Sequence, residues 1–343
     1  MSAFGNRKVI SWALYDWANS AFATTVMSGF FPLFLKQYWG ASHASGETTF
    51  YLGAANSFAS LVVVVLAPIL GSIADRGGAR KKYLTIFAAM AIVMTGALSL
   101  VGEGNWVVAV ALYIFAVIGF SGGNVFYDSL IVSVADERKL HRVSALGFSL
   151  GYLGGGLLFA LNVMMNLWPE SFGLADSTQA IRLSFLMVAA WWAVFSIPLL
   201  LFVREPVIKN KLSGWSSIAA GFTQLVTTFR ELRQLRTVIL MLLAYWLYID
   251  GVHTISRMAV DYGMALGFDY QDLILAMLVS LFVGFPATIA FGRIGERRGA
   301  RTGSYSGLGV YIGISAWAAP LTNGGAVYAL ASAIGRVPGG VQS

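Results

Sequence analysis

The chain consists almost entirely of apolar stretches that are long enough to cross a lipid bilayer. A membrane-spanning helix needs about 20 mostly apolar residues. Charged residues make up only 11% of this chain, compared with roughly 25% in a typical soluble domain. We therefore predict an all-α integral membrane protein with ten spans. They lie near residues 9–35, 50–73, 83–102, 106–133, 144–168, 180–203, 237–260, 272–294, 303–321 and 324–343.

The links between these spans alternate in charge. Every second link is poor in cations, and Lys36 is the only Lys or Arg in residues 36–49, 103–105, 169–179, 261–271 and 322–323. The opposite side of the membrane receives 19 of the 23 Lys and Arg residues, and by the positive-inside rule that side is the cytoplasm. The amino terminus is then cytoplasmic. This distribution explains the net charge of +7 without a nucleic-acid partner.

The longest link divides the chain into three parts. Residues 1–203 form a predicted six-helix bundle, residues 204–236 a cytoplasmic linker, and residues 237–343 a second bundle with four spans. Apolar residues recur every three or four positions within residues 213–236 and are accompanied by arginines. This pattern predicts an amphipathic helix, which either lies on the membrane surface or packs against the underside of the bundle.

A short motif occurs twice, at an offset of 221 residues. It follows the second and the eighth predicted helix and indicates an internal duplication of a six-helix unit. Its glycines allow close helix approach and a tight turn, and its acid can face the positive N-terminus of a neighbouring helix. We predict a gating role for both copies. They comprise Gly71, Asp75, Arg76, Gly78 and Arg80, and then Gly292, Glu296, Arg297, Gly299 and Arg301.

The repeated motif resembles the signature loop of the major facilitator superfamily. Residues 12–22, 151–156 and 339–343 look like the branch related to the vacuolar amino-acid effluxers of autophagy. The resemblance implies two six-helix repeats and a midplane site on a path lined by helices one, four, seven and ten. Because that fold has twelve helices, we expect a C-terminally incomplete member with about ten. The usual partner of Asp75, the start of helix eleven, would then be missing.

Polar residues inside the predicted spans suggest a transport path. An ionisable group in a span costs at least about 2.5 kcal/mol, so it should face a cavity or a partner. In helix one, Asp16, Asn19 and Ser20 share a face. Helix seven repeats this arrangement from Asp250 to Arg257. A structural role remains the alternative to a role in the transport path: for example, Asp250 could be neutralised by Arg257, and Asp16 could lie among the cytoplasmic headgroups.

Helices four and ten extend this set. Asn124, Tyr127 and Asp128 lie mainly on one face of helix four, where Asp128 could contact substrate or pair with loop cations. His253 could relay protons or serve only as a hydrogen-bonding side chain. The candidate substrate and proton pathway is Asp16, Asn19, Asn124, Tyr127, Asp128, Asp250, His253, Arg257 and Arg336.

A glycine run in helix five has two interpretations. Gly147, Gly151, Gly155 and Gly156 resemble the antiporter motif of the superfamily, with Tyr152 where proline is usual. Small residues at this spacing also let helices pack closely, and we favour this second interpretation.

The residue content narrows the class of function. The chain has no cysteine and only three scattered histidines, so neither a metal site nor a cofactor is predicted, and no enzymatic nucleophile and base pair is evident. We therefore predict a secondary transporter for a small polar solute, with amino acids first and protons as the candidate coupling ion. It would be a monomer surrounded by lipid in a bacterial inner membrane. The alternative is a non-transporting scaffold or an inactive relative.

Overall fold

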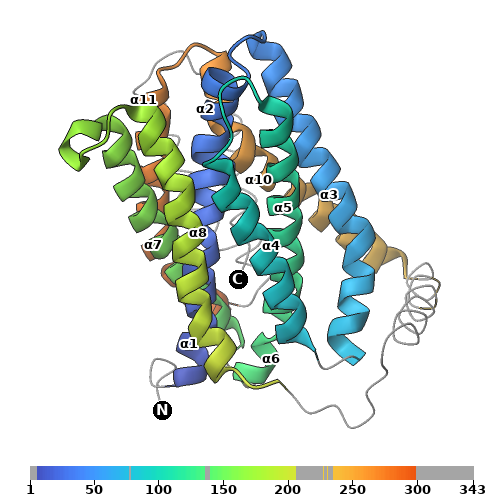
Figure 1. Cartoon of the computed structure of the whole chain (residues 1–343). Helices are drawn as coiled ribbons and strands as arrows, with labels where there is room; N and C mark the ends of the chain where they lie inside the picture. The colour runs from blue at the N-terminus through green and yellow to red at the C-terminus, as the bar shows by residue number, and fades with distance from the viewer. Residues whose placement is uncertain are drawn as a thin grey trace.

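The computed structural model describes residues 6–76, 79–135, 140–205, 227, 230 and 235–298. In these ranges the chain forms long helices that lie side by side (Figure 1). The long helices after the first span are α3 (Ser45–Arg76), α4 (Arg80–Leu98), α5 (Trp106–Ser129), α7 (Leu140–Leu167), α8 (Ser177–Phe202), α10 (Arg236–Ala265) and α11 (Tyr270–Arg298).

The first span is a composite helix of 33 residues, Arg7–Trp39. It begins as α1 (Arg7–Ala21), widens into the π-helix η2 (Phe22–Phe30), and continues through α2 (Phe31–Phe34) and the π-helix η3 (Leu35–Trp39). π-Helical turns are uncommon and often occur at functional sites. Here the first of them starts at Phe22, two residues after Ser20. Thr24 in this turn donates its hydroxyl to the Ser20 carbonyl at 3.0 Å.

The first eight predicted spans are confirmed as helices, with ends that differ by a few residues. Seven helices within the described ranges are long and apolar enough to cross a membrane, and α10 contributes a further 30 residues of helix. The short helices α6 (Ile131–Val134) and η5 (Pro169–Phe172) lie in the connections. The ninth and tenth spans and most of the amphipathic segment 213–236 lie outside the described residues.

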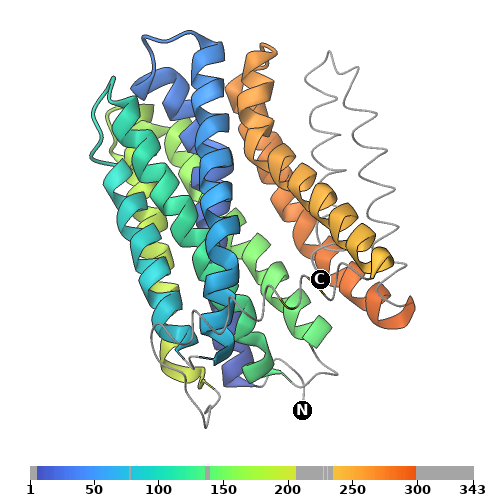
Figure 2. The same ribbon diagram turned by 90° about the vertical axis from the view of Figure 1, so that its right-hand side faces the viewer.

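Helix α1 is the centre of the N-terminal bundle. It packs against α7 and α8, while α5 packs between α3 and α4. The aromatic side chains of Tyr15, Phe22 and Trp192 are fully buried where α1 and η2 contact α8. Figure 2 shows α10 and α11 on one side of this bundle, sloping away from it toward the end where the chain begins.

The two ends of the bundle differ in charge. Arg7, Arg80 and Lys81 lie at one end, which we call the basic end. There Arg80 donates to the Ser129 carbonyl at 2.7 Å, and the Lys81 ammonium donates to the carbonyls of Leu200 and Val203 at 2.6 and 2.8 Å. These cations satisfy the carbonyls at the ends of α5 and α8, where the helix dipoles are negative.

At the opposite end an ion pair joins α10 to the first span. The Lys36 ammonium lies 2.7 Å from a carboxylate oxygen of Asp261 and also donates to the Asp261 carbonyl at 3.1 Å. The side chains are only 9% and 1% exposed. Helix α10 also contacts η2, α2 and α3. The N-terminal bundle is therefore linked to α10 at the end far from the basic loops.

The glycines of α7 allow this helix to lie directly against α1. A Cβ atom at Gly151 would lie 2.6 Å from the Ser20 hydroxyl oxygen and 3.2 Å from the Asp16 carboxyl carbon. At Gly155 it would lie 3.0 Å from the Ser20 carbonyl oxygen. Gly156 instead faces Leu281 of α11. The glycine run thus serves close helix packing, as the favoured interpretation of the sequence predicts.

Gly154→Ala is expected to destabilise the protein by about 1–3 kcal/mol, the usual cost of overpacking a filled core. The added Cβ would lie within 2.6 Å of both the Trp17 ring and its carbonyl oxygen, so α7 would have to shift. The thermal unfolding midpoint in detergent checks this. Gly53→Ala is the matched control, because no described atom lies within 4 Å of its added methyl group. Equal midpoints for the two variants would contradict the packing argument.

Candidate functional site

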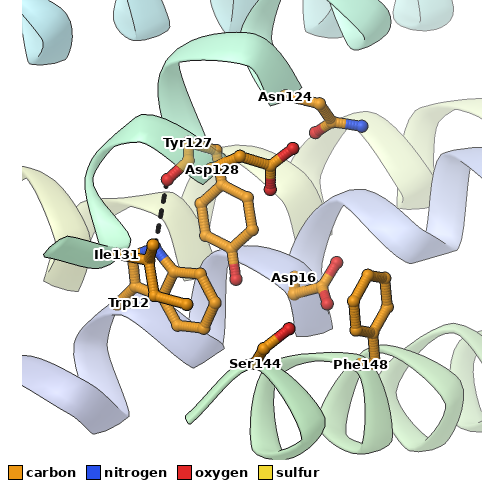
Figure 3. A pocket seen from close by; sticks show the side chains of 8 residues that line it. All are labelled: Trp12, Asp16, Asn124, Tyr127, Asp128, Ile131, Ser144 and Phe148. Carbon is orange, nitrogen blue, oxygen red and sulfur yellow. Dashed lines mark hydrogen bonds between the residues drawn. The ribbon is translucent and has the colours of Figure 1, made fainter. Parts of the chain in front are cut away.

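A cavity of about 310 Å³ lies between α1, α5, α6 and α7. It is lined by Trp12, Asp16, Asn124, Tyr127, Asp128, Ile131, Ser144 and Phe148 (Figure 3). Four of these, Asp16, Asn124, Tyr127 and Asp128, belong to the predicted pathway. The structure therefore brings together polar residues that are more than 100 positions apart in the sequence.

Trp12 and Tyr127 form one wall of the cavity. Their rings stack with centroids 4.5 Å apart and an angle of 9° between the planes. The Trp12 indole N–H donates to the Tyr127 carbonyl at 3.1 Å, which fixes both residues across the contact between α1 and α5. Figure 3 shows the Tyr127 ring extending into the cavity with its hydroxyl on the side of Asp16. That hydroxyl is buried and has no hydrogen-bond partner among the described residues.

Two carboxylates share the cavity. Asp16 comes from the middle of α1, and Asp128 is the penultimate residue of α5. Figure 3 shows both carboxyl groups directed into the same space. Across the described ranges, neither has a Lys, Arg or His nitrogen within 4.0 Å. An unpaired charge inside a membrane protein is costly, so this pair marks the cavity as a place where a cation or a proton can be held.

Asn19 supports the cavity from outside its lining. Its side-chain amide donates to the Asn124 side-chain oxygen at 2.7 Å. This bond joins α1 to α5 about one helical turn from Asp16 and from Asp128. Asn19 is 2% exposed. It is therefore a positioning residue for Asn124 in this structure.

Four lining residues are missing from the predicted pathway. They are Trp12, Ile131, Ser144 and Phe148. A signal existed for two of them: Ser144, Gly147, Phe148 and Gly151 follow the 3.6-residue period of one helix face. The resemblance to the superfamily directed attention to helices one, four, seven and ten, whereas the cavity also uses helix five, which is α7.

The cavity lies between the middle of the bundle and the basic end. Asp16 is nine residues beyond the start of α1, about 14 Å at 1.5 Å per residue, in a span of 33 residues. Asp128 stands next to the end of α5. The cavity found in the described residues thus lies on the basic side of the middle of the first span, and a midplane site stays a prediction.

The other predicted pathway residues lie elsewhere or outside the described part. Arg257 in α10 is close enough to Tyr113 of α5 to interact with it electrostatically. Asp250 and His253 belong to α10, but their side chains are not among those described. Arg336 also lies outside the described residues. The pairing of Asp250 with Arg257 stays a prediction.

The gating motif is described only in part. Gly71 lies in α3 with no described atom within 4 Å of an added Cβ, so no close helix approach occurs there within the described ranges. Arg80 binds the end of α5. Asp75 and Arg76 end α3, and Gly292, Glu296 and Arg297 belong to α11, with side chains that are not described. Gly78, Gly299 and Arg301 lie outside the described residues.

Comparison with known proteins decides the family. The family model described as "Vacuole effluxer Atg22 like" matches residues 43–141 and 132–343. The chain belongs to this Atg22-like family. The MFS-type transporter YxiO of Bacillus subtilis is 35% identical over 335 residues, which cover 97% of this chain and 78% of that protein. Autophagy-related protein 22 of Yarrowia lipolytica is 30% identical over 138 residues, 35% of this chain but only 23% of that protein.

Solved structures show the fold of this Atg22-like protein. A partially occluded inward-open form of the xylose transporter XylE from E. coli matches with a TM-score of 0.68. The alignment covers 98% of this chain and 85% of XylE at 13% identity. A structure of the nucleoside transporter NupG matches with a TM-score of 0.58 at 15% identity. The fold is therefore that of the major facilitator superfamily, as the repeated motif predicts.

Proposed function

We propose that this Atg22-like protein is a secondary transporter that moves a small polar solute across the membrane by alternating access. One observation carries the proposal. A cavity with two carboxylates lies near the basic end, where α10 and α11 slope away from the N-terminal bundle (Figure 2), while Lys36 and Asp261 join the two parts at the opposite end. This is the arrangement expected of a carrier that is closed on one side only.

The transport cycle follows from this geometry. The N-terminal bundle, residues 1–203, rocks against the helices that follow the linker 204–236. The contacts of α7 with α11, and of α10 with the first span, form the moving interface. Opening the opposite end requires the separation of Lys36 from Asp261. Closing the basic end brings the C-terminal helices toward Asp16 and Asp128. The repeated gating motifs would act at that end.

The charge pattern supports an orientation. The basic end carries Arg7, Arg80, Lys81 and Arg204, so we place it and the amino terminus in the cytoplasm. The compact links and the Bacillus relative favour a bacterial cell membrane. The chain would work as a monomer in contact with lipid. No catalysis is proposed for it.

The proposed substrate follows from sequence similarity to the vacuolar effluxers, and the proposed coupling ion follows from the ionisable residues of the site. The resemblance to vacuolar effluxers makes amino acids and related metabolites the first candidates. Asp16, Asp250 and His253 are the candidate proton-binding groups, because carboxylates and imidazoles inside a membrane can exchange protons with the two aqueous sides.

Counterflow in proteoliposomes tests the proposed function. The full chain is reconstituted, the vesicles are loaded with one unlabelled solute from a panel of amino acids, amines and sugars, and uptake of the same labelled solute is followed with and without a pH gradient. We expect uptake of one chemical class, and a faster rate under the gradient if protons are coupled. If the reconstituted protein is correctly folded but exchanges no solute of the panel, the proposed transport function is contradicted.

A further inference from the structure

The cavity beside Asp16 has the charge of a cation-binding site. The described residues of its lining supply two carboxylates, an amide and two hydroxyl groups, but no Lys, Arg or His. Three described cations at this end are engaged elsewhere: Arg80 and Lys81 bind helix carbonyls, and Arg7 lies 3.6 Å above the ring of Phe202. A ligand that enters this space meets negative charge that the described residues do not neutralise.

A second, independent feature points to a hydrogen-bonding ligand. Tyr127 is only 4% exposed, and its hydroxyl lacks a hydrogen-bond partner within the described part of the chain. Buried hydroxyl groups are normally hydrogen-bonded, because a buried polar group without a partner loses its bonds to water and gains nothing in return. Stacking on Trp12 holds the ring in place, and Figure 3 shows the hydroxyl facing the cavity. The missing partner is therefore expected to come from a ligand.

The remaining walls are apolar and mostly aromatic. Trp12, Tyr127, Ile131 and Phe148 surround the polar groups, and aromatic faces attract cations. The volume of about 310 Å³ is at the lower end of the range for small-molecule sites. A compact molecule with one charged end and one apolar or aromatic body would satisfy both parts of the lining.

A carboxylate group on the ligand has no described partner in this space. Arg257 of α10 is a described cation, and it interacts with Tyr113, which does not line the cavity. Tyr113 precedes Asn124 by eleven positions on α5, about 16 Å along the helix. An α-amino acid carries its ammonium and its carboxylate on the same carbon, so it cannot keep the carboxylate far from Asp16 while Asp16 holds the ammonium. In the cavity its carboxylate would instead be repelled by Asp16 and Asp128.

We propose that this cavity recognises the protonated amino group of a cationic amine with an apolar or aromatic body, and that it binds such amines in preference to the corresponding amino acids. Asp16 and Asp128 hold the ammonium, the Tyr127 hydroxyl accepts one of its N–H donors, and Trp12 and Phe148 contact the body. This inference rests on the proposed transport function and, of the amino acids and related metabolites named there, selects the amines as the substrate class of the same site.

Three ligands that differ in a single charged group test the proposal. They are tyramine, tyrosine, and 3-(4-hydroxyphenyl)propionate, which lacks the amine. Binding to the purified full chain is measured by calorimetry and by the fluorescence of the tryptophans. We expect tyramine to bind at least tenfold more tightly than tyrosine and the propionate not to bind. Asp16→Asn and Asp128→Asn should each weaken tyramine binding at least tenfold, whereas the exposed Glu103→Gln should leave it unchanged.

The outcomes separate the inference from the proposed function. Equal or tighter binding of tyrosine or the propionate to the wild-type chain would overturn the amine assignment, even if a carboxylate variant failed to fold. Counterflow of another solute class that does not depend on Asp16 and Asp128 would overturn the assignment and leave transport intact. Selective tyramine binding without any counterflow would leave the recognition standing and contradict the transport function.

Discussion

Asp16→Asn is expected to reduce the rate of solute transport by about 30- to 150-fold while the protein still folds. The substitution keeps the shape of a side chain that α7 approaches closely at Gly151, and it removes the negative charge from the cavity. A hydrogen bond to a charged group contributes about 1.5–3 kcal/mol, and 2–3 kcal/mol of that range corresponds to this fold-change. Initial counterflow rates in proteoliposomes measure the effect.

The matched control for this change is Glu103→Gln, which also removes one carboxylate but at an exposed position far from the cavity. It should transport at the wild-type rate. Thermal unfolding of both variants establishes that each is folded. An Asp16→Asn variant with normal stability and a normal transport rate would show that the cavity is not the transport site.

Asp261→Asn is expected to release the opposite end of the bundle. Asp261 is 1% exposed and Lys36 9%, and removal of one partner of a buried ion pair typically costs about 3–5 kcal/mol, since the other charge stays buried without compensation. That cost applies to the conformation closed at this end. It disappears when both side chains are solvated in the open conformation. The balance between the two conformations should therefore shift toward opening by at least tenfold.

Hydrogen–deuterium exchange checks this shift. The segments around Lys36 and Asp261 should exchange faster in the variant, while the buried contact between α1 and α8 at Trp192 should not change. The double change Lys36→Asp with Asp261→Lys should restore slow exchange, because it rebuilds an ion pair with reversed polarity. Unchanged exchange in Asp261→Asn would mean that the pair does not hold the two parts together.

The helices of this fold were predictable because the membrane imposes their length and apolarity. The sixth span, expected at residues 180–203, is helix α8, Ser177–Phe202. The eighth span, expected at residues 272–294, is helix α11, Tyr270–Arg298. Three of these four boundaries lie outside the expected ones, because polar residues continue a helix beyond the hydrocarbon core. The division of the chain at residues 203 and 236 stays a prediction.

The site residues were predictable only where polar residues stand out within the sequence of a single spanning helix. Asp16 and the Asn124 to Asp128 stripe follow from the cost of polar groups in a span. Trp12 and Phe148 do not, since an aromatic residue on a spanning helix is compatible with lipid, core or cavity. Their place is determined by how α7 packs on α1, which depends on glycines whose partners cannot be read from spacing.

The ion pair of Lys36 with Asp261 was missed for a related reason. Lys36 stands out as the single cation in the cation-poor links, but its partner is 225 positions away. Both residues lie at predicted span ends, where charged side chains usually face water. Only the packing of α10 against the first span shows that the two side chains are buried together.

Distance measurement by pulsed electron paramagnetic resonance tests alternating access most directly. The chain has no cysteine, so pairs of labelled cysteines can be introduced at exposed positions: Ser42 and Leu266 at the opposite end, and Lys82 and Thr237 at the basic end. Wild-type and Asp261→Asn proteins are compared in lipid vesicles. We predict that the variant gains a longer distance at the opposite end together with a shorter one at the basic end. Distances that stay fixed at both ends, or that lengthen at both together, would contradict a carrier that opens to one side at a time.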